Sequence, residues 1–207
     1  MICAIVLAAG ESRRMGSQKL LLPFGATTVI GRVVDQLLQS VIDKIFVVTG
    51  HNAGKIAEQL SARAVTIVDN PDYPSGMLSS VRCGLRALPR ECQAVMVVLG
   101  DQPSITTNLI DDLVQAFNMN HKGIVVPVFQ NRRGHPILLS TRYRDEILSQ
   151  YDGAGLRGLL HAHPDDVLEL AAPAPSILSD MDYPEDYQRE LEALGNGDAS
   201  LRNKPVK

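Results

Sequence analysis

Long apolar runs are absent from this 207-residue sequence, so it predicts no transmembrane helix, which needs about 20 mostly apolar residues in a row. No basic segment precedes the short apolar run at the N-terminus, unlike in a secretory signal. The three cysteines show neither Cys-x-x-Cys spacing nor the even number of a disulfide framework. These absences predict a cytoplasmic protein, not bound to membranes, whose thiols stay reduced.

An excess of basic residues is also absent. The formal net charge is -3 at pH 7, from 20 lysines and arginines against 23 aspartates and glutamates. Because nucleic-acid-binding domains usually carry a dominant basic face, we do not expect nucleic acid as a partner. A small phosphorylated ligand needs only a local positive patch, so this class of ligand stays open.

Apolar runs that are typical of buried strands alternate along the chain with segments of helical periodicity. The predicted strands are 2–8, 44–49, 65–68, 94–99 and 123–128, and the predicted helices are 29–39, 53–60, 77–88 and 107–117. This alternation predicts an α/β fold, with a largely parallel sheet and helices on both faces. No composition break marks a domain boundary, so we expect a single domain over 1–194 and a disordered polar tail over 195–207.

A basic loop follows the first predicted strand. Its sequence, AAGESRRMGSQK, begins with small residues at 8–10, which allow a ligand to approach the backbone, and continues with Arg13, Arg14 and Lys19. This pattern is typical of a phosphate cradle. It is not a Walker A motif, because five residues separate its two glycines, and it lacks the Gly-x-Gly of a dinucleotide-binding fingerprint. A solvated basic turn is the alternative interpretation.

Two aspartates are candidate metal ligands. Asp101 follows the apolar run 94–99, and ligands in open α/β sheets bind beyond the carboxyl ends of strands. Carboxylate and phosphate oxygens suit Mg²⁺, but an aspartate here equally suits bonding to the amides of a turn. Asp182 lies in the segment DMDYPEDY, where Pro184 and the acidic residues after it also fit an ordinary helix start. The spacing does not show whether Asp101 and Asp182 meet.

Other polar residues also have both a functional and a structural interpretation. Ser80 lies in the first turn of a helix that opens near Met77, where a hydroxyl group contacts a base or ribose or simply caps the helix. His135, before a proline, suits either a substrate contact or a surface turn. His161 and His163 lack the spacing of a metal site and are expected at a polar helix end.

Several motifs carry a resemblance to a known family. The segment LAAGESRRMGSQKLLLPFG is similar to the LAAGxSxRMGxxKxLLP signature of the MobA-like nucleotidyltransferases, and GMLSSVRCGL, GDQP, GHP and DMDYPEDY follow in the expected order. GDQP and the GM-x-x-S segment resemble the molybdenum cofactor cytidylyltransferase branch, whereas the guanylyltransferase branch tends to carry LAGG and GDMP. Tyr183 departs from the threonine that the family often has, which weakens a capping role there.

The resemblance implies a Rossmann-like, three-layer fold of the nucleotide-diphospho-sugar transferase type. It also implies Mg²⁺-dependent transfer of CMP from CTP to the terminal phosphate of molybdopterin bearing molybdenum, with release of pyrophosphate. A client molybdoenzyme is a further expected partner. The alternatives are a guanylyltransferase, a sugar-phosphate nucleotidyltransferase of the same fold, and a non-catalytic carrier of the molybdenum cofactor.

Matching motifs also imply roles for individual residues. Arg14 and Lys19 would neutralise the triphosphate, and with Asp101 they would form the catalytic set. Asp101 and Asp182 would bind the metal, and His135 would face the acceptor. The nucleotide-binding residues implied in this way are Leu7, Ala8, Ala9, Gly10, Arg14, Lys19, Ser80 and Asp101.

Overall fold

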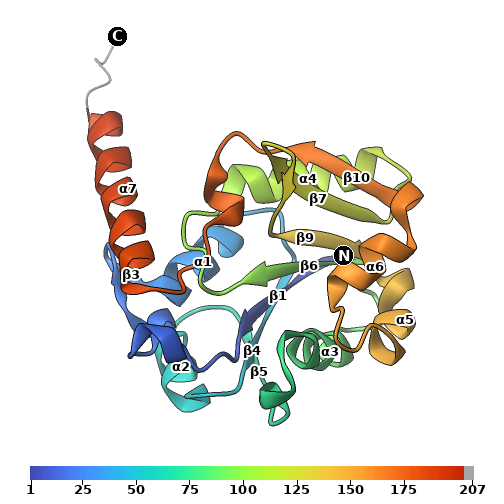
Figure 1. The fold of residues 1–207 in the computed structure, drawn as a ribbon, viewed down its shortest axis with the longest axis horizontal. Helices are drawn as coiled ribbons and strands as arrows, with labels where there is room; N and C mark the ends of the chain where they lie inside the picture. The colour runs from blue at the N-terminus through green and yellow to red at the C-terminus, as the bar shows by residue number, and fades with distance from the viewer. Residues whose placement is uncertain (203–207) are drawn as a thin grey trace.

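An eight-stranded mixed sheet forms the centre of the computed structural model, which describes residues 1–202 (Figure 1). Its strands are β1 (Ile2–Ala8), β4 (Lys44–Thr49), β5 (Thr66–Asp69), β6 (Ala94–Leu99), β7 (Ile124–Phe129), β8 (Arg132–Arg133), β9 (Ile137–Ser140) and β10 (Val167–Ala171). The order is β10-β7-β9-β6-β1-β4-β5, with β8 paired to β7. Strand β9 runs antiparallel to β6 and β7, and β8 runs antiparallel to β7. The other pairs are parallel, which confirms the predicted mostly parallel sheet.

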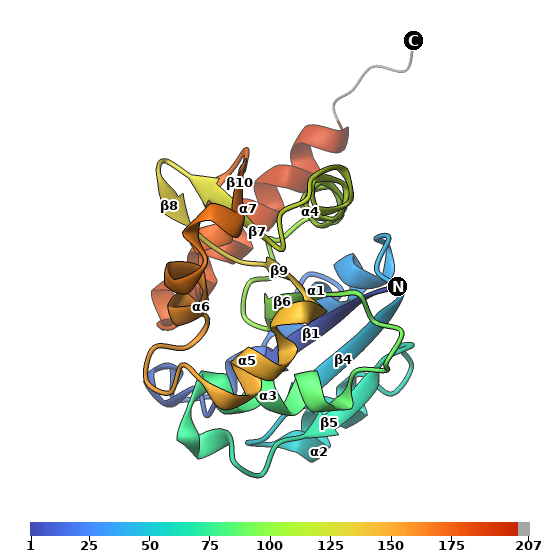
Figure 2. The same cartoon turned by 90° about the vertical axis from the view of Figure 1, so that its right-hand side faces the viewer.

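Helices cover both faces of the sheet, as predicted (Figure 2). They are α1 (Val29–Leu38), α2 (Ala53–Gln59), α3 (Met77–Ala87), α4 (Thr107–Met119), α5 (Arg144–Ser149), α6 (Leu156–Ala162) and α7 (Pro184–Arg202). Helices α1, α2 and α4 pack on one face, and α3, α5 and α6 pack on the other. Within residues 1–202, no helix combines the length and the apolar composition needed to cross a bilayer.

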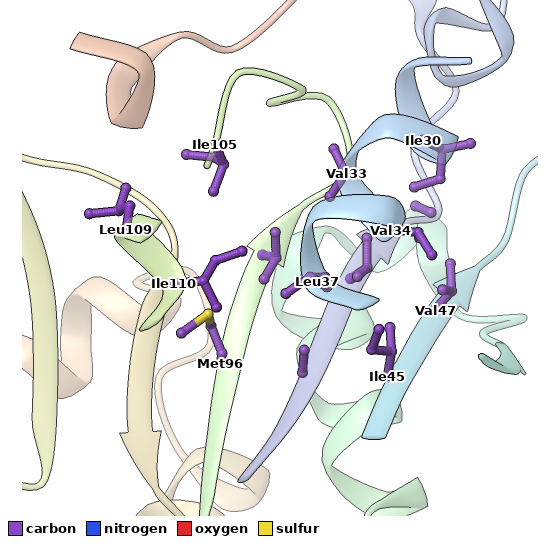
Figure 3. Close-up of a cluster of buried hydrophobic side chains, with 14 of the residues drawn as sticks. Ile30, Val33, Val34, Leu37, Ile45, Val47, Met96, Ile105, Leu109 and Ile110 are labelled. Atoms are coloured by element: carbon purple, nitrogen blue, oxygen red, sulfur yellow. The ribbon is translucent and has the colours of Figure 1, made fainter. Parts of the chain in front are cut away.

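Alternating side chains of the central strands build the two cores. In β1, Ala4 and Val6 belong to the cluster beneath α1, whereas Cys3 and Ile5 belong to the cluster beneath α3. Figure 3 shows the first cluster, in which the apolar stripe of α1 faces β1 and β4, while Met96 of β6 lies beside Ile110 of α4. A strand that is buried on both faces needs a continuous apolar sequence, which explains the runs seen in the sequence.

The C-terminal helix α7 begins beside a small hairpin of β2 (Pro23–Phe24) and β3 (Thr27–Thr28). The Tyr187 hydroxyl donates to the carbonyl oxygen of Pro23 at 2.5 Å. Because α7 runs to Arg202, it crosses residue 194, where we expected the domain to end and the tail to begin. Residues 203–207 of that tail lie outside the described residues. The single domain over 1–194 stays a prediction.

Close packing of α3 on β1 depends on Gly84. A Cβ atom at this position would lie 2.7 Å from Cγ2 of Ile5, which is fully buried. We therefore expect Gly84→Ala to overpack this contact and to lower the free energy of unfolding by about 1–3 kcal/mol. Gly54→Ala in α2 is the matched control, because a Cβ there meets no atom within 4 Å. Urea unfolding compares the two variants, and equal stability would show that the α3–β1 contact adapts.

Candidate functional site

A cleft of about 370 Å³ lies at the carboxyl ends of β1 and β6. These strands are neighbours in register, with Leu7 opposite Leu99, so the loops that follow them begin at the same level. The N-terminus of α3 and the segment before α7 complete the wall. The lining residues are Leu7, Ala9, Gly10, Ser12, Lys19, Leu20, Tyr73, Gly76, Met77, Ser80, Leu99, Asp101, Asp180 and Asp182. Ligands are expected at this edge of an open α/β sheet.

Most of the sequence-predicted site residues meet at this cleft. Those that line it are Leu7, Ala9, Gly10, Lys19, Ser80, Asp101 and Asp182. Ala8 does not line it, because its side chain is buried in the core beneath α1. Arg14 lines an adjoining hollow together with Lys19 and Asp182. The binding roles of these residues stay predictions.

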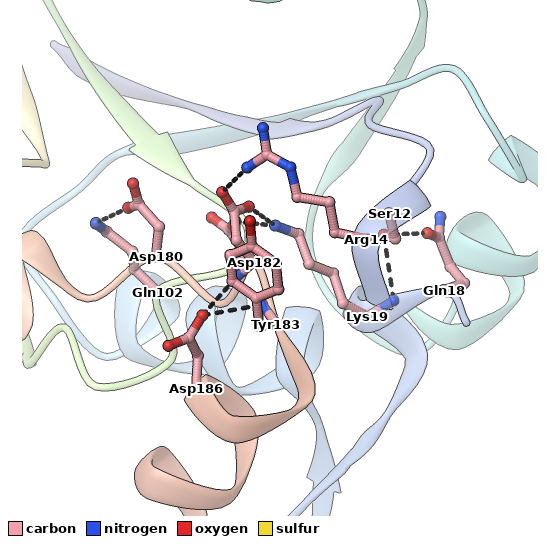
Figure 4. A network of polar contacts seen from close by, with 10 residues as sticks. Ser12, Arg14, Gln18, Lys19, Gln102, Asp180, Asp182, Tyr183 and Asp186 are labelled. Carbon is pink, nitrogen blue, oxygen red and sulfur yellow. Dashed lines mark hydrogen bonds and ion pairs between the residues drawn. The ribbon is translucent and has the colours of Figure 1, made fainter. Parts of the chain in front are cut away.

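Lys19 lies between two carboxylates at the centre of the site (Figure 4). Its Nζ is 2.5 Å from Oδ2 of Asp101 and 3.1 Å from Oδ1 of Asp182. The side chains of Lys19 and Asp101 are only 14% and 16% exposed. Burial lowers the pKa of Lys19, but the two carboxylates outweigh burial and hold this pKa above its usual value. The two carboxylates therefore favour the protonated, positively charged amine.

Arg14 contacts the second oxygen of Asp182. Its Nη1 donates to Oδ2 at 2.7 Å, and its guanidinium group lies 5.8 Å from the centre of the Tyr183 ring. Both oxygens of Asp182 thus accept from a basic side chain (Figure 4). This answers what the sequence spacing left open, because Asp182 and Asp101 share Lys19 as a partner.

Backbone contacts fix the segment that carries Asp182. The Asp186 carboxylate accepts from the backbone N–H groups of Asp182 at 3.1 Å and of Tyr183 at 2.9 Å. These bonds satisfy donors near the start of α7, a common role of acidic residues in the first helical turn. Asp186 therefore ties the segment that carries Asp182 to the first turn of α7.

Short-range hydrogen bonds shape the loop that carries Lys19. The Ser12 hydroxyl donates to Oε1 of Gln18 at 2.8 Å and accepts from the Lys19 backbone N–H at 3.3 Å. Ser12 and Gly16 have φ angles of 54° and 65°, in the left-handed region. Sequence reasoning gave Ser12 and Gln18 no role, although both lie inside the first motif.

Asp180 and Gln102 are further polar residues that sequence reasoning missed. Gln102 is 1% exposed, and its Nε2 donates to Oδ1 of Asp180 at 2.7 Å. Burial and the charge of Asp101 raise the pKa of Asp180. The signal was available, because Gln102 belongs to GDQP and Asp180 opens DMDYPEDY. Neither residue was assigned a functional role from the sequence, and Asp180 also fits the helix start at Pro184.

A second cavity, of about 490 Å³, adjoins the first, and the two share Met77, Leu99 and Asp180. Apolar side chains from α3, β6, β9 and α6 line much of it. Its remaining lining residues include Arg133, Gly134, His135, Arg157 and His161. Burial lowers the pKa of His135 and favours the neutral form of its ring.

The two histidines at the end of α6 lie in different surroundings. His161 borders the second cavity, whereas His163 lies directly after the helix and its Nε2 is 2.9 Å from Oε1 of Glu146. Across the part of the chain that the structure describes, no group of three or more His, Cys, Asp or Glu side chains is arranged to hold a metal ion. Any metal at the first cleft therefore needs ligands besides Asp101 and Asp182.

Comparison with known sequences identifies related proteins. Residues 4–167 match the family described as the MobA-like NTP transferase domain. The chain is also 30% identical over 189 residues to the molybdenum cofactor cytidylyltransferase of Escherichia coli. That match covers 90% of this chain and 93% of the relative, so it includes nearly all of both proteins.

Solved structures share the fold. A nucleotidyl transferase from Methanothermobacter superposes with a TM-score of 0.83 and 26% identity, covering 95% of this chain and 99% of that one. A Mycobacterium tuberculosis protein, solved in complex with manganese, superposes with a TM-score of 0.77 and 26% identity, covering 93% of this chain and 98% of that one. Both matches cover more than nine-tenths of this chain, so they extend over nearly the whole fold.

Proposed function

The chain belongs to the MobA-like NTP transferase family and is a nucleotidyltransferase, and from this we propose that it transfers CMP from CTP to the terminal phosphate of molybdopterin bearing molybdenum. The observation that carries the proposal is the cluster of Lys19, Asp101 and Asp182 at the strand ends, in a chain that matches a cytidylyltransferase along nearly its whole length. Pyrophosphate is the second product.

The first cleft is the proposed nucleotide site. The small residues after β1 let the triphosphate approach the backbone, and Ser80 lies at the N-terminus of α3 within reach of a base or ribose. Lys19 and Arg14 supply the positive charge that the β- and γ-phosphates need. Lys19 lines this cleft and Arg14 lines the adjoining hollow, so the β- and γ-phosphates lie on that side and the α-phosphate faces the second cavity.

The reaction needs no dedicated general base. An oxygen of the acceptor phosphate, already an anion, attacks the α-phosphorus of CTP, and the bond from that phosphorus to the bridging oxygen of the β-phosphate breaks. The electron pair leaves with pyrophosphate, whose charge Lys19 and Arg14 neutralise. The residues therefore act by positioning and by electrostatic stabilisation rather than by proton transfer.

Asp101 and Asp182 are the proposed metal ligands. Their oxygens face a common point, because each contacts the same Nζ atom at 3.1 Å or less. A donor set of carboxylate oxygens suits a hard divalent cation, and Mg²⁺ is the proposed ion. The relative solved with manganese supports a divalent cation in this fold. When bound, the ion supplies Lewis-acid neutralisation of the phosphate charge.

The second cavity is the proposed acceptor site, with His135 on its wall. Apolar side chains such as Leu78, Val81 and Leu156 suit a planar ring better than a sugar, whose hydroxyl groups would lose partners there. A client molybdoenzyme that receives the product is part of the proposal.

Arg157 is the proposed contact for an acidic group of the acceptor, because it lines the second cavity but not the first. We expect Arg157→Gln to raise the KM for the acceptor about tenfold, the loss of one charge-assisted hydrogen bond. The KM for CTP should stay unchanged. Arg132→Gln, which changes an exposed arginine outside both cavities, is the control. A rise in both KM values would place Arg157 in a general electrostatic role instead.

Pyrophosphate release tests the proposed function directly. CTP, GTP and ATP are each supplied with Mg²⁺, with and without molybdenum-loaded molybdopterin. Release from CTP that depends on the pterin supports the proposal, whereas release from GTP assigns a guanylyltransferase. Nucleotide binding without pyrophosphate release favours the sugar-phosphate nucleotidyltransferase or the carrier instead. The carrier is disfavoured by the paired carboxylates, because a carrier needs no catalytic metal site.

A further inference from the structure

The cations and the carboxylates of the site neutralise each other in the free protein. Lys19 contacts both Asp101 and Asp182, and Arg14 holds the remaining oxygen of Asp182. The groups proposed to bind the triphosphate are therefore the partners of the groups proposed to bind the metal. The basic side chains cannot bind phosphate until they leave the carboxylates, and the carboxylates cannot bind a metal until the basic side chains leave them.

We infer that Lys19 keeps a free divalent cation out of the site, so that metal and triphosphate enter together as the metal–nucleotide complex. This inference rests on the proposed function for the identity of the triphosphate. A metal ion that arrives alone displaces Lys19 and leaves its ammonium group without an anion. The complex brings phosphate oxygens that pair with Lys19 while its metal takes the carboxylates.

Burial determines how strongly Lys19 resists displacement. With only 14% of its side chain exposed, an unpaired ammonium group would lack most of its solvation by water. Breaking one partner from a buried pair is costly because it leaves an uncompensated charge. Arg14 differs, because its side chain is 63% exposed and water solvates it when Asp182 leaves. Lys19 should therefore account for most of the exclusion, and Arg14 for a smaller part.

The ligand set points the same way. Asp101 and Asp182 provide two carboxylates. Asp180 also lines the cleft, but among the side chains that the structure describes no group of three or more His, Cys, Asp or Glu is arranged to hold a metal ion. Mg²⁺ is typically held by one or two carboxylates together with substrate phosphates and water. Phosphate oxygens are thus needed twice, as ligands for the ion and as the replacement partner of Lys19.

Manganese binding without nucleotide tests the inference. Electron paramagnetic resonance of free Mn²⁺ gives its dissociation constant for the wild type and for Lys19→Met, Lys19→Arg and Lys44→Met. We expect Lys19→Met to bind Mn²⁺ at least tenfold more tightly than the wild type, because Asp101 loses its ion pair with Lys19 and Asp182 keeps only the exposed Arg14. Lys19→Arg keeps a cation there and should stay weak. Lys44→Met makes the same charge change at the opposite end of the sheet and should match the wild type.

Two results would overturn the inference. One is equal Mn²⁺ affinity for Lys19→Met and the wild type, and the other is equal tightening in Lys44→Met, which would reveal a general charge effect. If Lys19→Met does not fold, Arg14→Gln replaces it, with an expected tightening of about threefold for this exposed side chain. No tightening in that variant would also count against the inference.

Adding CTP separates this inference from the proposed function. In the wild type, CTP should tighten Mn²⁺ binding by a larger factor than in Lys19→Met, because only the wild type gains a new partner for Lys19. Failure of the wild type to bind CTP would remove the proposed substrate. The measurement without nucleotide would still decide whether Lys19 excludes the metal.

Discussion

Replacing Lys19 with alanine is expected to lower kcat by about 100- to 1,000-fold, the effect of removing one preorganised electrostatic contact from a transition state. Lys19 is the least exposed cation of the site and lies between Asp101 and Asp182. Negative charge develops on the leaving pyrophosphate as its bond to the α-phosphorus breaks. A fixed ammonium group beside it stabilises this charge in the transition state. Steady-state pyrophosphate release from CTP with the acceptor measures the loss.

Lys44→Ala is the control for this variant, because it removes the same charge from an exposed position at the start of β4. Circular dichroism and thermal unfolding establish that Lys19→Ala is folded at the assay temperature. Some loss of stability is expected, because the largely buried Asp101 loses its ion pair, although Asp182 keeps its contact with Arg14. Near-normal turnover by the folded Lys19→Ala protein would contradict the proposed catalytic role.

Fully buried strands were the easiest elements to predict from the sequence. Strands β4 and β6 begin and end at the predicted residues, because strands with sheet neighbours on both sides and helices on both faces need unbroken apolar runs. Strand β9 shows the limit of this signal. Its apolar run was recognisable, but a short run does not reveal that the strand is antiparallel and lies between β6 and β7. Strand β10, a partly exposed edge strand, lacks such a run and was not predicted.

The candidate site likewise contains residues that could be predicted from the sequence and residues that could not. The loop after β1 and Asp101 were recognisable because each follows a buried strand, and strand ends meet at one edge of the sheet. The place of Asp182 depends instead on the path of the chain after β10, which brings the start of α7 back to the cleft. Contacts such as Gln102 with Asp180 join segments that are far apart in sequence, and local patterns carry no information about them.

Asp101→Asn is expected to lower kcat by about 1,000-fold at a fixed Mg²⁺ concentration, at the upper end of single-group effects on transition-state stabilisation. An amide has nearly the shape of a carboxylate but lacks its charge. The substitution therefore weakens the proposed metal site and also the contact with Lys19, which is 2.5 Å long in the wild type. The reaction should also need more Mg²⁺ to reach half of its maximal rate. This second readout separates a lost metal ligand from a merely disturbed loop.

The matched control is Asp112→Asn, which makes the same chemical change on the exposed side of α4. It should leave both kcat and the Mg²⁺ requirement unchanged. The comparison with Lys19→Ala is equally informative, because the two variants disturb one ion pair from opposite sides. Loss of Lys19 should weaken the stabilisation of the leaving pyrophosphate without raising the Mg²⁺ concentration needed for half of the maximal rate. Loss of Asp101 should raise that concentration. If both variants raised the Mg²⁺ requirement equally, the division of the site into phosphate-binding cations and metal-binding carboxylates would be wrong.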